Sequence, residues 1–396
     1  MMIEKGYLNF IHFVNRLTET NKRVYFTGLF FAILITLKEV LGLSYNNFQI
    51  FSFATSDFWS GINPYSSWHH LSLHGKPLDN FLYGPLFSVL FTPFTLFPAW
   101  LGVFFWNIFT YSVFYFSVFT LPDQFDFVKK KFIFFFSSLL LFATLLSVQF
   151  NPVVAAIFLF SFTLLEKKQG LLAVLLIFLS GFTKVYGIFQ IAMILFYPGF
   201  RKNILYSALI GIIFIFIPLI NVPLNELATY YQSWIFKVMD HSEAVLRFSI
   251  YRPLCSFNSS IEPFTGFISL GVLFVILLFT LRKLKIFKES ILFRGQFLGI
   301  IMSWAILFGV GSERHTYVIA IAGYAIWYLC STPGLFEKIL LWINFVLLGV
   351  MPIDILCPPV ISEFILKKLF LGIIVFTITW GIMVYKTFSS KYELKN

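Results

Sequence analysis

Residues that could do chemistry gather in three short stretches of an otherwise apolar chain of 396 residues. A polar insert at 44–83 contains three histidines and the carboxylates Asp57 and Asp79. The stretches FTKVY at 182–186 and SERHTY at 312–317 add cations, a third carboxylate and a further histidine. A carboxylate or a histidine can accept a proton from a hydroxyl group, and a lysine or an arginine can hold an anionic group. These residue types therefore favour group transfer involving an anionic ligand.

Several of these residues also have a purely structural explanation. Lys184, at the end of an apolar span, either binds an anion or extends to the lipid headgroups. Glu313 and Arg314 either belong to a ligand site or form an interfacial ion pair. Gln149 and Asn151 either contact a ligand or form hydrogen bonds between helices. The residues alone leave both explanations open.

A metal site is not predicted from the histidines of the insert. His69 and His70 are consecutive and would point apart on a helix, and no adjacent carboxylate completes a set with His74. The chain also lacks a P-loop, an HExxH motif and a CxxC motif. We therefore expect neither a metal nor a cofactor.

The composition indicates which elements must position these residues. The chain is 59% hydrophobic and 12% charged, and its mean hydropathy is +0.85. That leaves too little polar surface to cover a soluble body of this size. Because helices satisfy their own backbone hydrogen bonds in lipid, we predict an all-α polytopic membrane protein that forms a single integral domain over 1–396.

The apolar runs predict about twelve membrane-spanning helices, within a range of ten to thirteen, since a bilayer core of about 30 Å requires about 20 apolar residues. The predicted spans are 24–43, 99–121, 132–149, 152–166, 171–183, 185–198, 204–222, 264–281, 295–310, 316–331, 338–352 and 368–385. The polar stretches 44–98 and 222–263 lie between spans. Segment 84–98 is predicted to be interfacial or re-entrant, because a crossing there would invert the charge of every later loop.

The Lys and Arg residues predict the orientation. Twenty of the 29 fall on one side of the predicted spans and eight on the other, with Lys38 inside the first span. Because basic loops stay in the cytoplasm, both termini are predicted to be cytoplasmic and 44–98 and 222–263 extracytoplasmic. The net charge of +11 is then explained by topology and contact with anionic lipid, and no nucleic-acid partner is expected.

Residues 46–107 resemble the opening of glycosyltransferase family 87, the DUF2029 group of the GT-C membrane glycosyltransferases. That group has an acidic D-F-x-V-Y stretch, a G-x-P-Y turn and a Y-x-P-L-F-A-L segment that ends in Leu-Pro. The corresponding residues here are 47–51, GINPY at 61–65, and YGPLF at 83–87 with Phe97-Pro98.

The resemblance continues downstream. Gln149 and Asn151 match a G-Q-x-N turn of the family, Lys184 matches a lysine that closes a Leu-rich helix, and 312–315 match a cluster with Ser and His. The motifs occur in the same order and on the same predicted side. The resemblance implies a GT-C-like fold with many helices around an extracytoplasmic cavity.

The resemblance also implies a reaction, the transfer of a sugar from a polyprenyl-phosphate carrier to a lipid or glycan acceptor among the membrane lipids. Lys184 and Arg314 suit the lipid phosphate, whereas hydrogen bonds to the sugar or the acceptor suit polar groups at the matched positions. The implied substrate-binding residues are Asn47, Asn63, Tyr65, Tyr83, Gln149, Asn151, Lys184 and Arg314. We expect a hexosyltransferase, with mannose as one candidate sugar, in a bacterial inner membrane.

The chain departs from the family pattern at Asn47, where the family has an acidic residue. An amide is not a useful proton acceptor at neutral pH. The catalytic base is then expected among Asp57, Asp79, Glu313 and His315. The alternatives are a lipid-linked sugar flippase and a GT-C-like protein that binds its ligand without transfer, although no clear internal repeat favours a transporter.

Overall fold

The structure of the chain is a computed structural model that describes residues 16–66, 69–244, 248–309, 311–353 and 356–389. The described residues form helices and contain no strand, only an isolated bridge between Leu71 and Pro77. The elements are α2 Asn21–Leu41, α3 Asn46–Trp59, α4 Pro85–Thr95, α5 Ala99–Phe119, α6 Phe127–Leu146, α7 Asn151–Glu166, α8 Gly170–Thr183, η1 Val185–Gln190, α9 Ile191–Ile194, α10 Phe200–Phe216, η2 Ile217–Ile220, α11 Leu224–Ala244, α12 Tyr251–Phe257, η4 Ser259–Phe264, α13 Thr265–Arg282, α14 Leu284–Glu289, α15 Ile291–Leu307, η5 Arg314–Thr316, α16 Tyr317–Cys330, α17 Leu335–Asn344, η6 Phe345–Val350, α18 Pro359–Glu363, η7 Phe364–Lys368 and α19 Leu371–Ser389. The predicted all-α polytopic membrane fold is confirmed.

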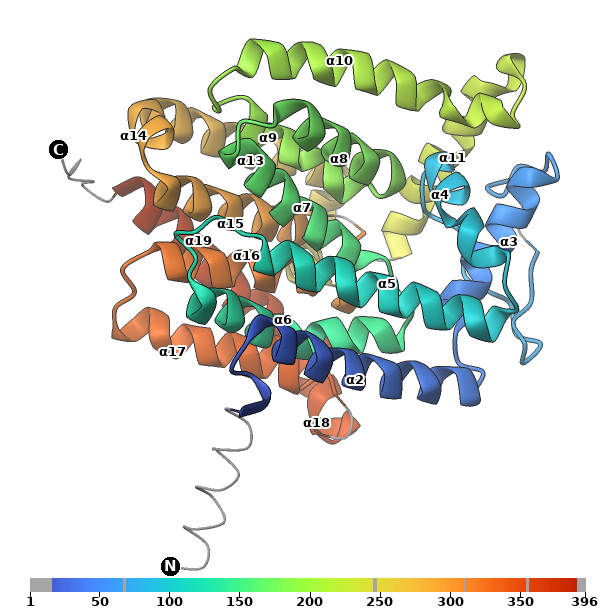
Figure 1. Cartoon of the computed structure of the whole chain (residues 1–396), viewed down its shortest axis with the longest axis horizontal. Helices are drawn as coiled ribbons and strands as arrows, with labels where there is room; N and C mark the ends of the chain where they lie inside the picture. Colours follow the sequence, from blue (N-terminus) through green and yellow to red (C-terminus); the bar gives the residue numbers. More distant parts are fainter. Residues whose placement is uncertain (1–15, 67–68, 245–247, 310, 354–355, 390–396) are drawn as a thin grey trace, which may run out of the picture.

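The helices form a bundle with two distinct ends (Figure 1). One end holds the first residues of α2, the last residues of α19 and the loops α5–α6, α9–α10 and α14–α15. We call it the basic end. The opposite end holds α3, α4 and the residues between them, and we call it the insert end. The terminal residues 1–15 and 390–396, which were predicted to be cytoplasmic, lie outside the described residues.

The core of the bundle is built by α7, α15 and α16. The described side chains on these helices are almost all buried, and Trp304, Tyr317 and Trp327 are the bulkiest of them. α15 packs along α16, and α7 packs against α5 and α8. These helices have 14 to 17 residues, which at 1.5 Å per residue gives roughly 21–26 Å. They are shorter than a bilayer core of about 30 Å, and the surrounding helices bury them.

Every predicted span falls on a helical segment, although the segments differ in length. Within the described part of the chain, five segments are long and apolar enough to cross a membrane: Asn21–Leu41, Ala99–Phe119, Phe200–Ile220, Ser259–Arg282 and Leu371–Ser389. The predicted span 185–198 is instead the short 3₁₀ helix η1 followed by the single turn α9. The helical conformation is therefore interrupted at Lys184, between α8 and η1; we call this interruption the break at Lys184.

Segment 84–98, predicted to be an interfacial or re-entrant helix pair, contains one short helix, α4. α4 has 11 residues and so spans roughly 16 Å, about half of a bilayer core. It packs against α3, α5 and α8, and the long helix α5 starts four residues after α4 ends. The amphipathic helix α11 lies over the insert, where the Trp234 indole N–H donates to the Leu82 carbonyl at 3.1 Å.

Candidate active site

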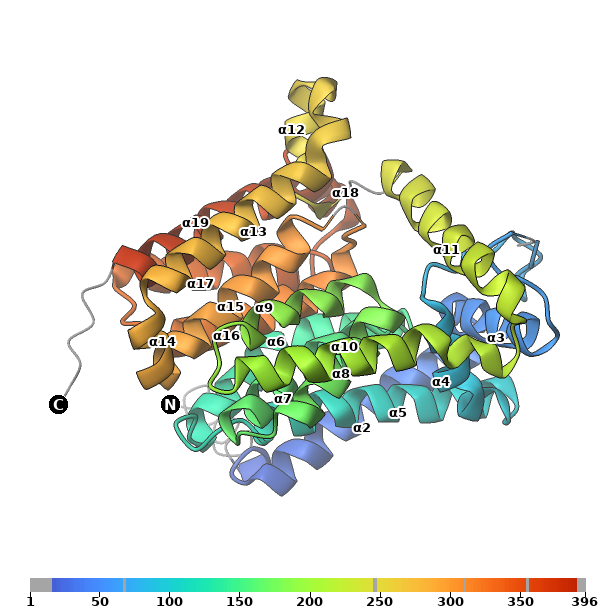
Figure 2. The same cartoon turned by 90° about the horizontal axis from the view of Figure 1, so that it is seen from above.

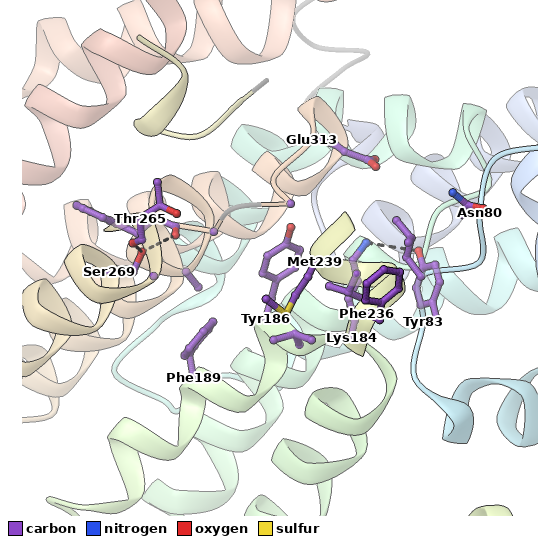
Figure 3. A pocket seen from close by; sticks show the side chains of 18 of the residues that line it. Asn80, Tyr83, Lys184, Tyr186, Phe189, Phe236, Met239, Thr265, Ser269 and Glu313 are labelled. Atoms are coloured by element: carbon purple, nitrogen blue, oxygen red, sulfur yellow. Dashed lines mark hydrogen bonds between the residues drawn. The ribbon is translucent and has the colours of Figure 1, made fainter. Parts of the chain in front are cut away.

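A cavity of about 1370 Å³ lies at the insert end, between the insert, the break at Lys184, α11 and α13. It exceeds the roughly 300–1,000 Å³ of most small-molecule sites. Figure 3 shows Tyr83, Lys184, Tyr186 and Glu313 around this space, with Thr265 and Ser269 of α13 farther along it. Among the predicted site residues, the cavity is lined by Asn47, Asp79, Tyr83, Gln149, Lys184 and Glu313.

Lys184 carries the positive charge of this cavity, since no other Lys or Arg is among its described lining residues. It follows the last residue of α8 in an extended conformation, and its N–H donates to the Ser180 carbonyl at 2.7 Å. The hairpin into η1 is tight, because a Cβ on Gly187 would meet the Ser180 hydroxyl at 1.9 Å. Burial lowers the pKa of the Lys184 ammonium to about 8, against the opposing effect of Glu313.

The insert is joined to this break by Gly84. A Cβ on Gly84 would lie 2.0 Å from the Phe182 carbonyl oxygen, so only glycine permits the approach. The close approach places Tyr83 beside Lys184, with 3.4 Å between the phenol oxygen and the ammonium and 4.9 Å between the ammonium and the ring centre. Burial raises the pKa of the Tyr83 phenol, and nearby Glu313 raises it further. Tyr83 therefore stays neutral as a hydrogen-bonding group.

A chain of side-chain amides connects Lys184 to Glu313. The Lys184 ammonium donates to Asn151 Oδ1 at 2.7 Å, and Asn151 Nδ2 donates to Gln149 Oε1 at 3.3 Å. Gln149 Nε2 in turn donates to Glu313 Oε2 at 3.4 Å. Asn151 is fully buried behind this wall and does not line the cavity. It therefore holds Lys184 and Gln149, which do line it.

The turn that presents Gln149 contains an unusual backbone angle. Val148 has φ +50° and is fully buried. A β-branched residue rarely adopts this left-handed conformation, and glycine adopts it readily. Val148 occupies the glycine position of the G-Q-x-N pattern, so this chain keeps the turn although it lacks the residue best suited to it.

His315 lies behind the cavity wall. Its Nε2 is 3.0 Å from the Ser147 hydroxyl, while Asn47 donates its amide to the Ser147 carbonyl at 2.6 Å. Burial, with Arg314 and Lys184 nearby, lowers the pKa of the His315 imidazole to about 4. The neutral ring does not line the cavity, and its Nδ1 has no hydrogen-bond partner among the described residues.

Asp57 lies away from the cavity. Its carboxylate is 2.7 Å from His70 Nε2, and the His70 ring stacks on Phe53 with 4.4 Å between ring centres. Asp57 thus joins α3 to the residues that follow it. Asp79 differs, because it is exposed and lines the cavity at its rim.

The GINPY residues support the site from outside. Asn63 Oδ1 accepts the Tyr65 N–H at 3.0 Å, and the buried Tyr65 hydroxyl donates to the Tyr83 carbonyl at 2.7 Å. Neither residue lines the cavity, so both act on the backbone around Tyr83. Arg314 lines a separate small space with Phe248.

Most of the other residues that line the cavity were not singled out from the sequence, and Asn80, Tyr186, Glu262 and Trp304 are examples. Asn80 and Tyr186 are next to predicted residues, so the stretches that contain them could have revealed both. Glu262 and Trp304 have no such signal, since they come from η4 and α15, far along the chain. Among the described residues, no group of three or more His, Cys, Asp or Glu could hold a metal ion.

Comparison with known proteins gives a family match. The model of glycosyltransferase family 87 matches residues 81–332, which include Tyr83, Lys184 and Glu313. No curated protein and no solved structure matches the chain.

Proposed function

The chain belongs to glycosyltransferase family 87, and from this premise we propose that it transfers a hexose from a polyprenyl-phosphate carrier to a lipid or glycan acceptor. The proposed site is the cavity at the insert end. We infer that it is one of the GT-C membrane glycosyltransferases. Mannose is the first sugar to test.

The observation that carries the proposal is that Lys184 is the one Lys or Arg among the described residues that line the cavity, whose lining is both polar and apolar. Lys184 lines the cavity together with Tyr83, Gln149 and Glu313, and Phe236 of α11 and other aromatic and aliphatic side chains line it as well. One ammonium group suits a phosphate that bears a sugar on one side and a lipid on the other. The amides and the phenol suit sugar hydroxyls.

The reaction requires few groups. The acceptor hydroxyl oxygen forms a bond to the anomeric carbon as the bond from that carbon to the carrier phosphate oxygen breaks. The phosphate leaves with the bonding electrons and is held by Lys184, while a carboxylate takes the hydroxyl proton. Among the carboxylates expected to act as the base, Glu313 and Asp79 line the cavity. We favour Glu313, because Gln149 Nε2 donates to its carboxylate and orients it.

We propose, from the distribution of the basic loops, that the cavity lies on the extracytoplasmic side of an inner membrane, with both termini in the cytoplasm. A cysteine introduced at Lys130, in a variant whose native cysteines Cys255, Cys330 and Cys357 are replaced by serine, tests this orientation. A membrane-impermeant maleimide should label it only after the cells are opened. Labelling of intact cells would reverse the orientation and the proposed side of the reaction.

The function itself is tested with purified protein, labelled polyprenyl-phosphate mannose and an extract of membrane lipids and glycans. Glu313→Gln and Asp79→Asn are compared with Asp57→Asn and His315→Ala, and we expect loss of transfer in one of the first two. Full activity in all four variants would remove the catalytic assignment. Binding of the donor without transfer by the unmodified protein would favour the flippase or the inactive binding protein.

A further inference from the structure

The cavity has a second polar region, away from the insert. Figure 3 shows Thr265 on one side of Lys184 and Tyr83 of the insert on the other. In Figure 2, α11 lies between α13 and the insert helix α3. The short helix η4, which leads into α13, adds further polar side chains to this region. We call it the α13 subsite, and it is lined by Ser259, Glu262, Thr265 and Ser269.

The hydroxyl groups of the α13 subsite are fixed by the protein, whereas its carboxylate is not. The Ser269 hydroxyl is 2.6 Å from the Tyr251 hydroxyl and donates to the Phe308 carbonyl at 2.9 Å. The Thr265 hydroxyl donates to the Glu262 carbonyl at 3.0 Å. The partly exposed Glu262 carboxylate has no ion pair or hydrogen bond with another described residue. A polar group that lines a cavity without a partner is available to a ligand.

Backbone without side chains connects the α13 subsite to Glu313. Phe308 follows α15, and Gly309, Gly311 and Glu313 line the cavity after it. A Cβ on Gly309 would lie 2.5 Å from the Ala305 carbonyl oxygen, so only glycine fits there. The two glycines present no side chain to the cavity. A headgroup in the α13 subsite can therefore extend past them toward Glu313.

The charges of the cavity restrict what this headgroup can be. The described lining contains three carboxylates, Asp79, Glu262 and Glu313, and one ammonium group, Lys184. In the proposed function, the ammonium binds the donor phosphate, which brings a further negative charge. Like charges repel each other more strongly in a cavity than in water. A second anionic group is therefore disfavoured, whereas an uncharged hydroxyl group can donate to a carboxylate.

The acceptor must also present a hydroxyl group, because the new glycosidic bond forms at a hydroxyl oxygen. An ethanolamine headgroup would pair with a carboxylate, but it has no hydroxyl group to react. A sugar headgroup has several hydroxyl groups on one ring, so one can react beside Glu313 while its neighbours donate to Glu262. Phe308 adds an apolar surface to the lining, as is usual in sites that bind small molecules.

We propose that the α13 subsite binds the acceptor, and that the acceptor is a glycolipid with an uncharged sugar headgroup whose hydroxyl groups donate to Glu262. This inference rests on the proposed function and adds the class and the binding site of the acceptor. The donor sugar stays with Tyr83 and Gln149, which leaves the α13 subsite to the acceptor. The bonds that form and break are those of the proposed function, and the acceptor proton goes to Glu313. Glu262 binds and selects the acceptor.

Two lipids that differ in charge test the class of acceptor. Diglucosyl diacylglycerol has uncharged sugars, whereas phosphatidylglycerol has two free hydroxyl groups and an anionic phosphate. With purified protein and labelled polyprenyl-phosphate mannose in vesicles, transfer to the glycolipid should be about tenfold faster than transfer to phosphatidylglycerol. Equal use of the two lipids, or a preference for phosphatidylglycerol, would overturn the proposal.

Variants of Glu262 test the residue. Glu262→Ala should raise the KM for the glycolipid by about tenfold and leave the KM for the donor unchanged, because it removes a contact with the acceptor alone. Glu262→Lys should raise the rate of transfer to phosphatidylglycerol by about tenfold, a gain that a misfolded protein could not show. Glu226→Ala is the matched control, because Glu226 is an exposed carboxylate of α11 that does not line the cavity. An unchanged KM for the glycolipid in Glu262→Ala would contradict the proposed contact.

Binding measured without transfer separates this inference from the proposed function. A diglucosyl diacylglycerol with a diazirine on its headgroup should label the peptide 259–269 after irradiation, less in Glu262→Ala and equally in Glu226→Ala. Such labelling, without transfer from the donor to any acceptor, would contradict the function and leave the headgroup site intact. Transfer together with labelling confined to other segments would contradict the site and leave the function intact. Absence of both would overturn both.

Discussion

The Gly84 N–H donates to the Thr183 carbonyl oxygen at 3.0 Å, which joins the end of the insert to the end of α8. This bond brings together two segments that are about 100 residues apart in the sequence. Tyr83 and Lys184, the residues next to the bonded pair, thereby face the same cavity. The site depends on this contact between two backbone segments.

Gly84→Ala should disrupt the site. The new methyl group would lie 2.0 Å from the Phe182 carbonyl oxygen, so one of the two segments must move. A shift of about 1 Å at reacting groups can reduce a rate by up to a hundredfold. We expect reduced transfer of sugar from polyprenyl-phosphate mannose, measured with purified protein. Wild-type activity in the alanine variant would show that the close approach is not needed.

Lys184→Met should remove the charge that holds the phosphate. Loss of one preorganised electrostatic contact to a leaving group costs about 10²–10³ in rate. Lys184→Arg keeps the charge but not the shape of the side chain, so we expect a transfer rate between those of Lys184→Met and the unmodified protein. Steady-state rates of the two variants provide the measurement. Equal activity of the methionine variant and the unmodified protein would exclude the phosphate role.

Binding of the carrier should depend on pH through Lys184, whose pKa is about 8 in the empty site. Below that value the ammonium is charged and can hold the phosphate. Above it, the affinity for polyprenyl phosphate should fall by about tenfold per pH unit, because one proton must be regained. Binding measured from pH 7 to 10 tests this. Lys184→Arg should abolish the dependence in this range, since the arginine stays charged.

Asp57→Asn should affect stability rather than chemistry. Asp57 pairs with His70 at 2.7 Å and does not line the cavity. The asparagine variant keeps an acceptor oxygen for His70 but loses the charge, so it should lose about 1 kcal/mol of stability. Glu313→Gln should show the converse, with a transfer rate lower by about 10²–10⁴ and an unchanged Tm. A lower transfer rate for Asp57→Asn at unchanged Tm would contradict the assignment of Asp57 to stability and of Glu313 to chemistry.

His315 should make the protein sensitive to acid. The pKa of its imidazole is about 4 in the folded protein, against 6.5 ordinarily, so the unfolded chain binds more protons between these values. Stability should therefore fall as the pH is lowered from 6.5 to 4. His315→Gln should lessen the drop in Tm over this interval. An identical drop in Tm in the variant and the unmodified protein would contradict the lowered pKa of His315.

Some of the fold could be predicted because membrane helices have a local cause. An apolar run of sufficient length forms a helix in lipid wherever it occurs, so the predicted spans all correspond to helices. The predicted span 185–198 shows the limit of this reasoning. Hydropathy does not distinguish one continuous helix from the 3₁₀ segment η1 followed by the single turn α9.

For the site, residue types and their order in the sequence were enough to indicate Lys184, Glu313 and Gln149, and the family pattern added Tyr83. Neither the residue order nor the family pattern could separate Asp79, which lines the cavity, from Asp57, which pairs with His70. That distinction depends on which distant segments pack together. The sequence by itself determined a helical membrane protein with its reactive groups in a few polar stretches, because hydrophobicity and residue chemistry are local. Only the tertiary structure decided which of those groups share one cavity, because backbone contacts such as that of Gly84 with Thr183 join residues that no local pattern connects.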